Sequence, residues 1–423
     1  MKRQDILARA QLLPLLAVGL YSLVIIALLT PFFQTHFVFL HAVNFPFYAN
    51  FSNPERYGIA PGKARNIRIT SSDGISLGAW HIVPDAYYYK VHPKVNSPSL
   101  KDSDFDAALH AFPTVIYFHG NAGNRAAPFR TATYAYITSR LHANVVAIDY
   151  RGFGDSKASG VTPSEEGLGR DARAAWDWVV ERTSVVSDKD REITAGASII
   201  LMGQSLGTGV ASKLALEVTE AGHPPQALVL IAPYASLRSL VLDYRLGGVI
   251  PVMGPLKHMP GINALIDNYL ITQFNSTDAL SKVYFGAKSE GSGHGAPGKR
   301  LAPHLVVIHA TSDDVIPFRH SEHLFDTLER QESARGSNGL GRGPQQYDID
   351  GFGRISHLDL VGTHTPQARV GGQDGGRIDD HNEKSATLNL IRTHWGGHNT
   401  GFSEGVADFV CQLVGWTVDG RQT

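Results

Sequence analysis

The sequence has a single cysteine, Cys411, among its 423 residues. One thiol cannot form an intramolecular disulfide framework, and it cannot supply a cysteine-rich zinc module. Other ligand motifs are also missing. No H-E-x-x-H sequence occurs, and no phosphate-binding glycine loop stands between a predicted strand and a predicted helix. We therefore expect neither a metal nor another cofactor.

The chain also lacks an excess of charge of either sign. Lys and Arg number 38, Asp and Glu number 39, and the formal net charge is −1. Binding a nucleic acid needs clustered basic surface, and no basic cluster occurs along the chain. Nucleic acid is therefore not an expected partner. The composition, 43% hydrophobic and 18% charged, is that of a globular chain with a sizeable core.

One apolar run departs from this average. Residues 12–33 contain no charged side chain. As a helix that rises about 1.5 Å per residue they would reach roughly 33 Å, which is enough to cross a bilayer. The apolar region of a cleaved signal peptide is shorter, typically about 7–15 residues. We therefore predict an uncleaved transmembrane helix over residues 12–33.

The charges that flank this run predict its orientation. Three basic side chains lie within residues 1–11, and none follows the run until Arg56. The positive-inside rule then places residues 1–11 in the cytosol and the rest of the chain in the lumen or outside. Glycosylation sequons at Asn50 and Asn275 would be accessible on that side, although such sequons also arise by chance.

Strand-like and helix-like patterns alternate along most of the remaining chain. Short β-rich apolar runs have the composition of strands that are buried on both faces, and amphipathic patterns lie between several of them. The alternation predicts an α/β fold with a doubly wound, mostly parallel sheet. The predicted elements are strands at 114–118, 144–149, 198–202, 227–231 and 305–309, helices at 163–181 and 209–220, and an earlier antiparallel hairpin at 67–83.

Two stretches interrupt this alternation. Residues 235–300 contain an apolar series and a helical run, and we predict that they form a cap. Residues 331–384 are rich in Gly, Gln, Asp and His with little periodicity, which predicts a flexible surface insertion. The core then comprises residues 67–234 and 301–417, and a membrane-proximal segment, 34–66, precedes it.

The sequence Gly203-Gln204-Ser205-Leu206-Gly207 joins a predicted strand to a predicted helix. A serine on such a tight turn needs neighbours without a bulky Cβ, and Gly203 and Gly207 meet that need. We predict that Ser205 is a nucleophile. The N-terminus of the following helix points at Ser205 and would favour an oxyanion formed there.

An oxyanion hole needs a second backbone N–H beside that of Leu206. The loop His-Gly-Asn-Ala-Gly-Asn at 119–124 follows a predicted central strand, and its glycines allow the backbone to approach a substrate. Asn121 and Ala122 are the candidate donors. We interpret His119 as a structural residue, because the catalytic histidine is expected to come last along the chain.

A serine hydroxyl needs a histidine to accept its proton and an acid to orient that histidine. Asp313 and Asp314 both follow the strand at 305–309, and spacing alone does not separate them. Among the later histidines we favour His398, just before a final amphipathic helix, over His357. The remaining candidates, which we interpret as solvated loop residues, are His364, His381 and His394.

With these residues assembled, the chain resembles the α/β-hydrolase superfamily and, within it, the membrane-anchored lysophosphatidylserine and monoacylglycerol lipases. The resemblance implies Asp313 as the acid, through its D-x-x-[VI]-P pattern, and His398 as the base. It also implies an endoplasmic reticulum membrane protein with a lumenal catalytic domain. The matching motifs lie at 119–125, 149–156, 162–167, 203–211 and 309–318.

We therefore expect a membrane-anchored serine hydrolase that cleaves carboxylic esters of single-chain lipids drawn from the bilayer. A protein thioesterase could use the same three residues, but it would need a cytosolic active site. A catalytically inactive scaffold is a further alternative. A phosphate headgroup could meet one of four basic side chains, which could equally be solvated: Arg125, Arg238, Arg245 and Lys257.

Overall fold

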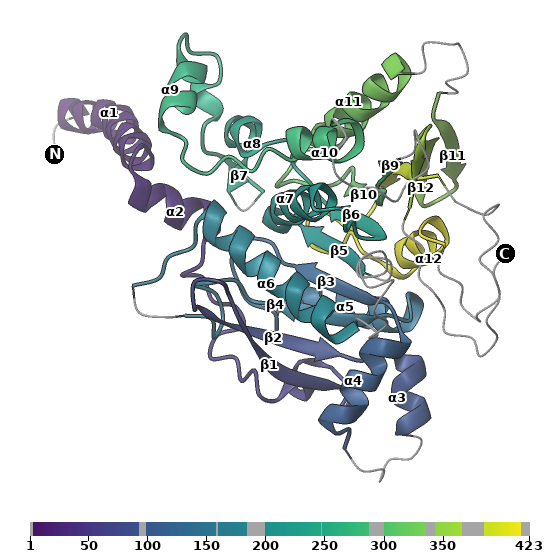
Figure 1. Ribbon diagram of the computed structural model, residues 1–423. Helices are drawn as coiled ribbons and strands as arrows, with labels where there is room; N and C mark the ends of the chain where they lie inside the picture. The colour runs from purple at the N-terminus through teal and green to yellow at the C-terminus, as the bar shows by residue number, and fades with distance from the viewer. Residues whose placement is uncertain are drawn as a thin grey trace.

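A sheet of ten strands runs through the protein in the order β1-β2-β4-β3-β5-β6-β10-β14-β12-β11 (Figure 1). The computed structural model describes residues 3–92, 99–157, 160–183, 199–246, 248–286, 300–335, 343–365 and 385–415. The strands from β4 to β14 in this order are parallel, whereas β1, β2, β12 and β11 pair antiparallel at the two edges. The strands are β1 Ala64–Thr70, β2 Ser76–Ile82, β3 Thr114–Phe118, β4 Asn144–Ile148, β5 Ile199–Gln204, β6 Ala227–Ile231, β10 His304–Ala310, β11 Gln345–Ile349, β12 Gly353–Asp359 and β14 Thr387–Thr393.

The predicted parallel strands and the predicted hairpin are all present, within three residues of their expected bounds. Every residue of β3, β4, β5, β6 and β10 is buried, because helices cover both faces of the sheet. One face packs against α6 Glu165–Thr183, α7 Leu206–Glu220, α10 Ser276–Phe285 and α11 Arg319–Arg335. The other packs against α5 Pro128–Arg140 and α12 Glu404–Leu413. Two further helices, α3 Asp85–Val91 and α4 Asp102–Ala111, lie near the β1 edge (Figure 1).

The cap is smaller than predicted. Its elements are α8 Leu237–Asp243, the short strands β7 Arg245–Leu246 and β8 Ile250–Pro251, and α9 Ile262–Tyr269. Helix α10 falls within the predicted range 235–300, but it packs against α7 and α11 as part of the core. Residues 287–299 lie outside the described part of the chain.

The single transmembrane helix predicted over residues 12–33 is interrupted in the structure. Helix α1, Arg3–Leu28, ends before Pro31, which begins α2, Pro31–Phe39. Proline lacks an N–H, which disfavours a helix interior but suits the first position of a helix, and Pro31 occupies that position in α2; α1 nevertheless contains Pro14 in its interior. Within the described residues, no single helix has the length and apolarity of a membrane span. One pair has both together, Leu12–Leu28 with Pro31–Phe39, bent by 95°.

The region predicted as a flexible insertion, 331–384, is partly ordered sheet. Strand β12 pairs antiparallel with β14, and β11 pairs with β12. Weak periodicity concealed these strands because β11 lies at the sheet edge and most of its residues are exposed. The short strand β13, Thr363–His364, pairs in parallel with β9, Arg300–Leu301. Residues 366–384 lie outside the described residues.

The buried His81 on β2 predicts how stability depends on pH. Burial, followed by the nearby charge of Arg65, lowers the pKa of His81 from 6.5 to about 3. In the unfolded chain His81 is protonated below about pH 6.5, whereas in the folded chain it stays neutral. The free energy of unfolding therefore falls as the pH falls. Between pH 7 and pH 5 this residue should remove about 2 kcal/mol from the free energy of unfolding. Urea titrations of the wild type and of His81→Gln at both pH values would measure it. An equal loss in the two proteins would contradict the assignment.

Candidate active site

Ser205 occupies a strained turn between β5 and α7. Its φ is 52° and its ψ is −119°, a region that few residues other than glycine adopt. The turn requires close backbone contacts on both sides. A Cβ on Gly203 would lie 2.3 Å from the carbonyl oxygen of Gly207, and one on Gly207 would lie 2.0 Å from that of Phe118. The two glycines therefore allow the geometry that presents Ser205.

The structure brings three predicted residues together. Nε2 of His398 lies 3.0 Å from Oγ of Ser205, and Nδ1 of His398 lies 2.9 Å from Oδ2 of Asp313. The carboxylate only accepts hydrogen bonds, so Nδ1 carries the proton and Nε2 is free to accept the serine proton. His398 lies between β14 and α12, and Asp313 follows β10. All three side chains thus lie beyond the carboxyl ends of the parallel strands β5, β10 and β14.

Asp313 is stabilised as a carboxylate. Its Oδ1 accepts hydrogen bonds from the backbone N–H groups of Val315 and Ile316, each at 2.9 Å, and Nε2 of His309 lies 3.2 Å from Oδ2. Burial opposes its charge, but the hydrogen bonds from His309 and His398 outweigh burial and hold the pKa of Asp313 well below its ordinary value. Asp313 therefore stays ionised and can hold the ring of His398 in one orientation.

Asp314 and the alternative histidines lie elsewhere. Asp314 is exposed, and its carboxylate lies against Gly248 of the cap. In β12, Nδ1 of His357 lies 2.7 Å from Oδ1 of Asn389. His119 is fully buried, with Nδ1 bonded to the carbonyl of Gly120. His381 lies outside the described residues.

The geometry separates the two candidate oxyanion donors. The N–H of Ala122 donates to the carbonyl of Phe39 at 3.0 Å, so it is already used. The N–H groups of Asn121 and Leu206 have no hydrogen-bond partner among the described residues. Gly120 brings the loop against the nucleophile, because a Cβ there would lie 3.1 Å from Cβ of Ser205. Asn121 and Leu206 are therefore the available pair, and the expectation for Ala122 is wrong.

The segment 38–46, which comprises the end of α2 and the residues that follow it, binds this loop, a contact that the sequence analysis missed. Besides the bond from Ala122, the N–H of Gly123 donates to Val43 at 2.6 Å and that of Asn124 donates to Phe45 at 3.0 Å. The side-chain amide of Asn124 also donates to Oδ1 of Asn44 at 2.9 Å. The membrane-proximal segment is thus part of the active-site framework.

Arg130 of α5 binds the backbone carbonyls of the same loop, 119–124. Its buried guanidinium donates to the carbonyls of Asn124 at 2.8 Å, Ala122 at 2.9 Å and Gly120 at 3.2 Å. No carboxylate of the described residues pairs with it. By binding three carbonyl oxygens on one side, Arg130 fixes the peptide planes whose N–H groups include that of Asn121.

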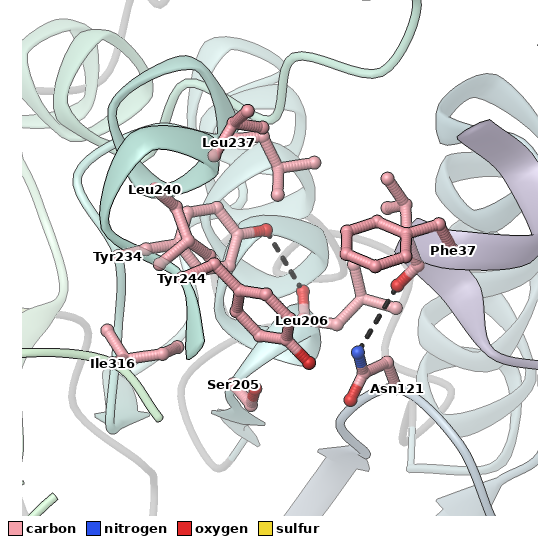
Figure 2. A pocket seen from close by; sticks show the side chains of 11 residues that line it. Phe37, Asn121, Ser205, Leu206, Tyr234, Leu237, Leu240, Tyr244 and Ile316 are labelled. Atoms are coloured by element: carbon pink, nitrogen blue, oxygen red, sulfur yellow. Dashed lines mark hydrogen bonds between the residues drawn. The ribbon is translucent and has the colours of Figure 1, made fainter. Parts of the chain in front are cut away.

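The first cavity opens above Ser205 and is mostly apolar; it contains about 490 Å³ of space, part of it open to solvent. Figure 2 shows Ser205 at its floor, Phe37 entering from α2 and Leu240 from α8. Tyr244 extends from the cap toward Ser205 and Asn121. Burial raises the pKa of Tyr244, and a hydrogen bond with the Asn121 side chain acts in the opposite direction. Phe37 and Tyr244 are lining residues that sequence reasoning missed.

Three of the four basic side chains considered for a headgroup are paired within the protein. Arg125 is fully buried and bonded to Asp149 and Asp155. Arg238 pairs with Asp267, and Lys257 pairs with Asp243. Among the described residues, no group of three or more His, Cys, Asp or Glu side chains is arranged to hold a metal ion.

The chain is similar in sequence to known proteins. Residues 112–276 match the family model described as serine aminopeptidase, S33, an α/β hydrolase. Lysophosphatidylserine lipase ABHD12 of Danio rerio is 27% identical over 79% of this chain and 77% of its own. The protein of that name from Rattus norvegicus is 28% identical over 79% and 73%. A solved alpha-beta hydrolase from Vibrio vulnificus is 15% identical, covers 72% of this chain and 83% of that chain, and has a TM-score of 0.43.

The chain is a serine ester hydrolase with an α/β-hydrolase fold. Within that superfamily it is similar to the lysophosphatidylserine lipases named above.

Arg130 should act on turnover rather than on substrate binding. Arg130→Met leaves the loop carbonyls without their donor, and a small displacement of the oxyanion donors should lower kcat about a hundredfold. KM for a water-soluble short-chain ester should change little. Steady-state kinetics would measure both constants, and thermal unfolding would verify the fold. Arg130→Lys keeps the charge but not the planar guanidinium, so its kcat should lie between those of the wild type and Arg130→Met. A folded Arg130→Met protein with the wild-type kcat would contradict this role.

Proposed function

We propose that this chain is a membrane-associated hydrolase that cleaves the carboxylic ester of single-chain lipids. The observation that carries the proposal is that Ser205, whose Oγ lies 3.0 Å from Nε2 of His398, lines the floor of an apolar cavity. An apolar cavity with few polar groups suits the acyl part of a lipid. The similarity to lysophosphatidylserine lipases supports the same substrate class.

In the proposed acylation step, Oγ of Ser205 attacks the acyl carbonyl carbon while its proton moves to Nε2 of His398. The carbonyl oxygen becomes an oxyanion, which accepts hydrogen bonds from the N–H groups of Asn121 and Leu206. The imidazolium of His398 is stabilised by Asp313. It then protonates the leaving alcohol oxygen, the carbon–oxygen bond breaks, and the acyl group remains as an ester on Ser205.

Deacylation repeats this chemistry with water. His398 accepts a proton from the water as its oxygen attacks the acyl-enzyme, and the same two N–H groups hold the second oxyanion. The proton returns to Oγ of Ser205, and the fatty acid leaves. Because Asp313 remains ionised well below its ordinary pKa, protonation of Asp313 does not limit this cycle at mildly acidic pH.

Association with a membrane is supported by the surface of α1. Leu13, Leu16, Leu20 and Leu23 are each 65–67% exposed. Soluble surfaces rarely expose so many large apolar side chains together, and such a patch marks a membrane or protein contact. The uncharged composition of residues 12–33 favours lipid.

The roles of the three side chains can be tested by substitution. Ser205→Ala should abolish labelling by a fluorophosphonate probe, and it should lower ester hydrolysis at least about 10⁴-fold. His398→Ala and Asp313→Asn should each cause losses on the order of 10³–10⁶-fold. The matched controls, His357→Ala and Asp314→Asn, should retain activity. Full activity in His398→Ala together with loss in His357→Ala would refute the assignment of the base.

The proposed lumenal orientation has its own test. Asn50 and Asn275 are exposed. Asn275 is the N-cap residue of α10, and its side-chain oxygen accepts a hydrogen bond from the N–H of Asp278, which leaves the amide nitrogen out of this bond. Both should therefore accept a glycan in cells, and endoglycosidase treatment should increase gel mobility. Asn50→Gln and Asn275→Gln should each remove one glycan and so reduce the mobility change that endoglycosidase causes. A protein without any glycan would contradict the lumenal orientation and would favour the thioesterase alternative.

A further inference from the structure

A second apolar cavity lies between the N-terminal helices and the cap. It contains about 600 Å³ of space, part of it open to solvent, and it is lined by Ile25 and Leu28 of α1 and by Leu265 and Ile266 of α9. Most other lining residues are also aliphatic or aromatic. The cavity is separate from Ser205, which lines only the first one.

The two cavities adjoin. Phe37, Val38 and Val241 line both of them, so these three residues form the boundary between the cavities. In Figure 2, Phe37 stands on the α2 side of the first cavity, opposite the cap side chains. An extended apolar ligand that begins at Ser205 can therefore continue past Phe37 into the second cavity when these side chains adjust.

The polar side chains of Gln34 and Tyr21, near the second cavity, form hydrogen bonds within the protein. The side-chain amide of Gln34 donates to the carbonyl of Tyr269 at 2.7 Å and accepts from the N–H of Ile271 at 3.1 Å. The hydroxyl of Tyr21 donates to the carbonyl of Val252 at 3.0 Å. These bonds join α1 and α2 to the cap, and they engage both polar atoms of the Gln34 side chain within the protein. The ligand chemistry that fits is hydrocarbon.

We propose that the second cavity binds the distal half of a long acyl chain whose carbonyl carbon lies at Ser205, which gives the enzyme a preference for long-chain substrates. The assignment rests on the proposed function, because it takes Ser205 as the attacking group. The wall formed by Ile25 and Leu28 continues into the exposed leucines of α1. The chain would thus lie beside the part of the protein that is best suited to contact lipid.

The test compares hydrolysis of palmitoyl and butyryl p-nitrophenyl esters in detergent micelles by the full-length protein. Leu265→Trp fills the second cavity from the cap, and Leu28→Trp fills it from α1. Each should lower the palmitoyl-to-butyryl ratio of kcat/KM at least about tenfold, because several methylene groups lose their apolar contacts. Asn263→Trp, on the exposed side of α9, is the matched control and should keep the wild-type ratio.

An unchanged ratio in both blocking variants would overturn the assignment, and so would equal losses on the two esters. The parallel measurement with Ser205→Ala separates this failure from a failure of the proposed function. If hydrolysis persists in Ser205→Ala, the proposed nucleophile is wrong. If hydrolysis requires Ser205 but its chain-length ratio is insensitive to Leu265→Trp and Leu28→Trp, only the second cavity is wrongly assigned.

Discussion

The backbone of Ser205 has a positive φ of 52°, and the active site depends on how the fold maintains this conformation. Such a conformation costs about 1–3 kcal/mol and persists only where the surroundings enforce it. The N–H of Ser205 donates to Ile231 at 2.9 Å, and the hydroxyl of Thr208 donates to the carbonyl of Ser205 at 2.6 Å. Together with the close approach at Gly203, these contacts point Oγ at His398 and into the cavity rather than into the sheet.

The second constraint is the loop that faces this serine. Its carbonyls are bound by Arg130, and its N–H groups from Ala122 to Asn124 are bound by the segment 38–46. The N–H of Asn121, in contrast, has no hydrogen-bond partner among the described residues. Segment 38–46 begins at the end of α2, so the helices that carry the apolar surface are covalently continuous with the framework of the oxyanion hole. The proposed membrane contact and the proposed chemistry therefore share one structural unit, with the acyl cavities between that unit and the cap.

Much of this could be predicted from the sequence, since buried parallel strands leave continuous apolar runs and the Gly-x-Ser-x-Gly turn has a specific geometric need. The triad geometry agrees with Ser205, Asp313 and His398, although Asp313 and Asp314 were not separable by spacing alone. Other features depend on long-range contacts that leave no local pattern. The bond from Ala122 to Phe39 joins residues far apart in sequence. Nothing in the sequence around Arg130 distinguishes it from other helical arginines, because its role depends on the loop that packs against it. The break before Pro31 could not be predicted from proline alone, because Pro14 lies inside α1 without ending it.

The central claim is that hydrolysis proceeds through an acyl ester on Ser205. Its most direct test is rapid acid quenching of the protein during turnover of a palmitoyl lysophospholipid, followed by peptide mass spectrometry. The account predicts a palmitoyl adduct on the peptide that contains Ser205, and this adduct should disappear as the substrate is consumed. An acyl group on a different residue, or steady hydrolysis with no acyl-enzyme on Ser205 at any quench time, would contradict it.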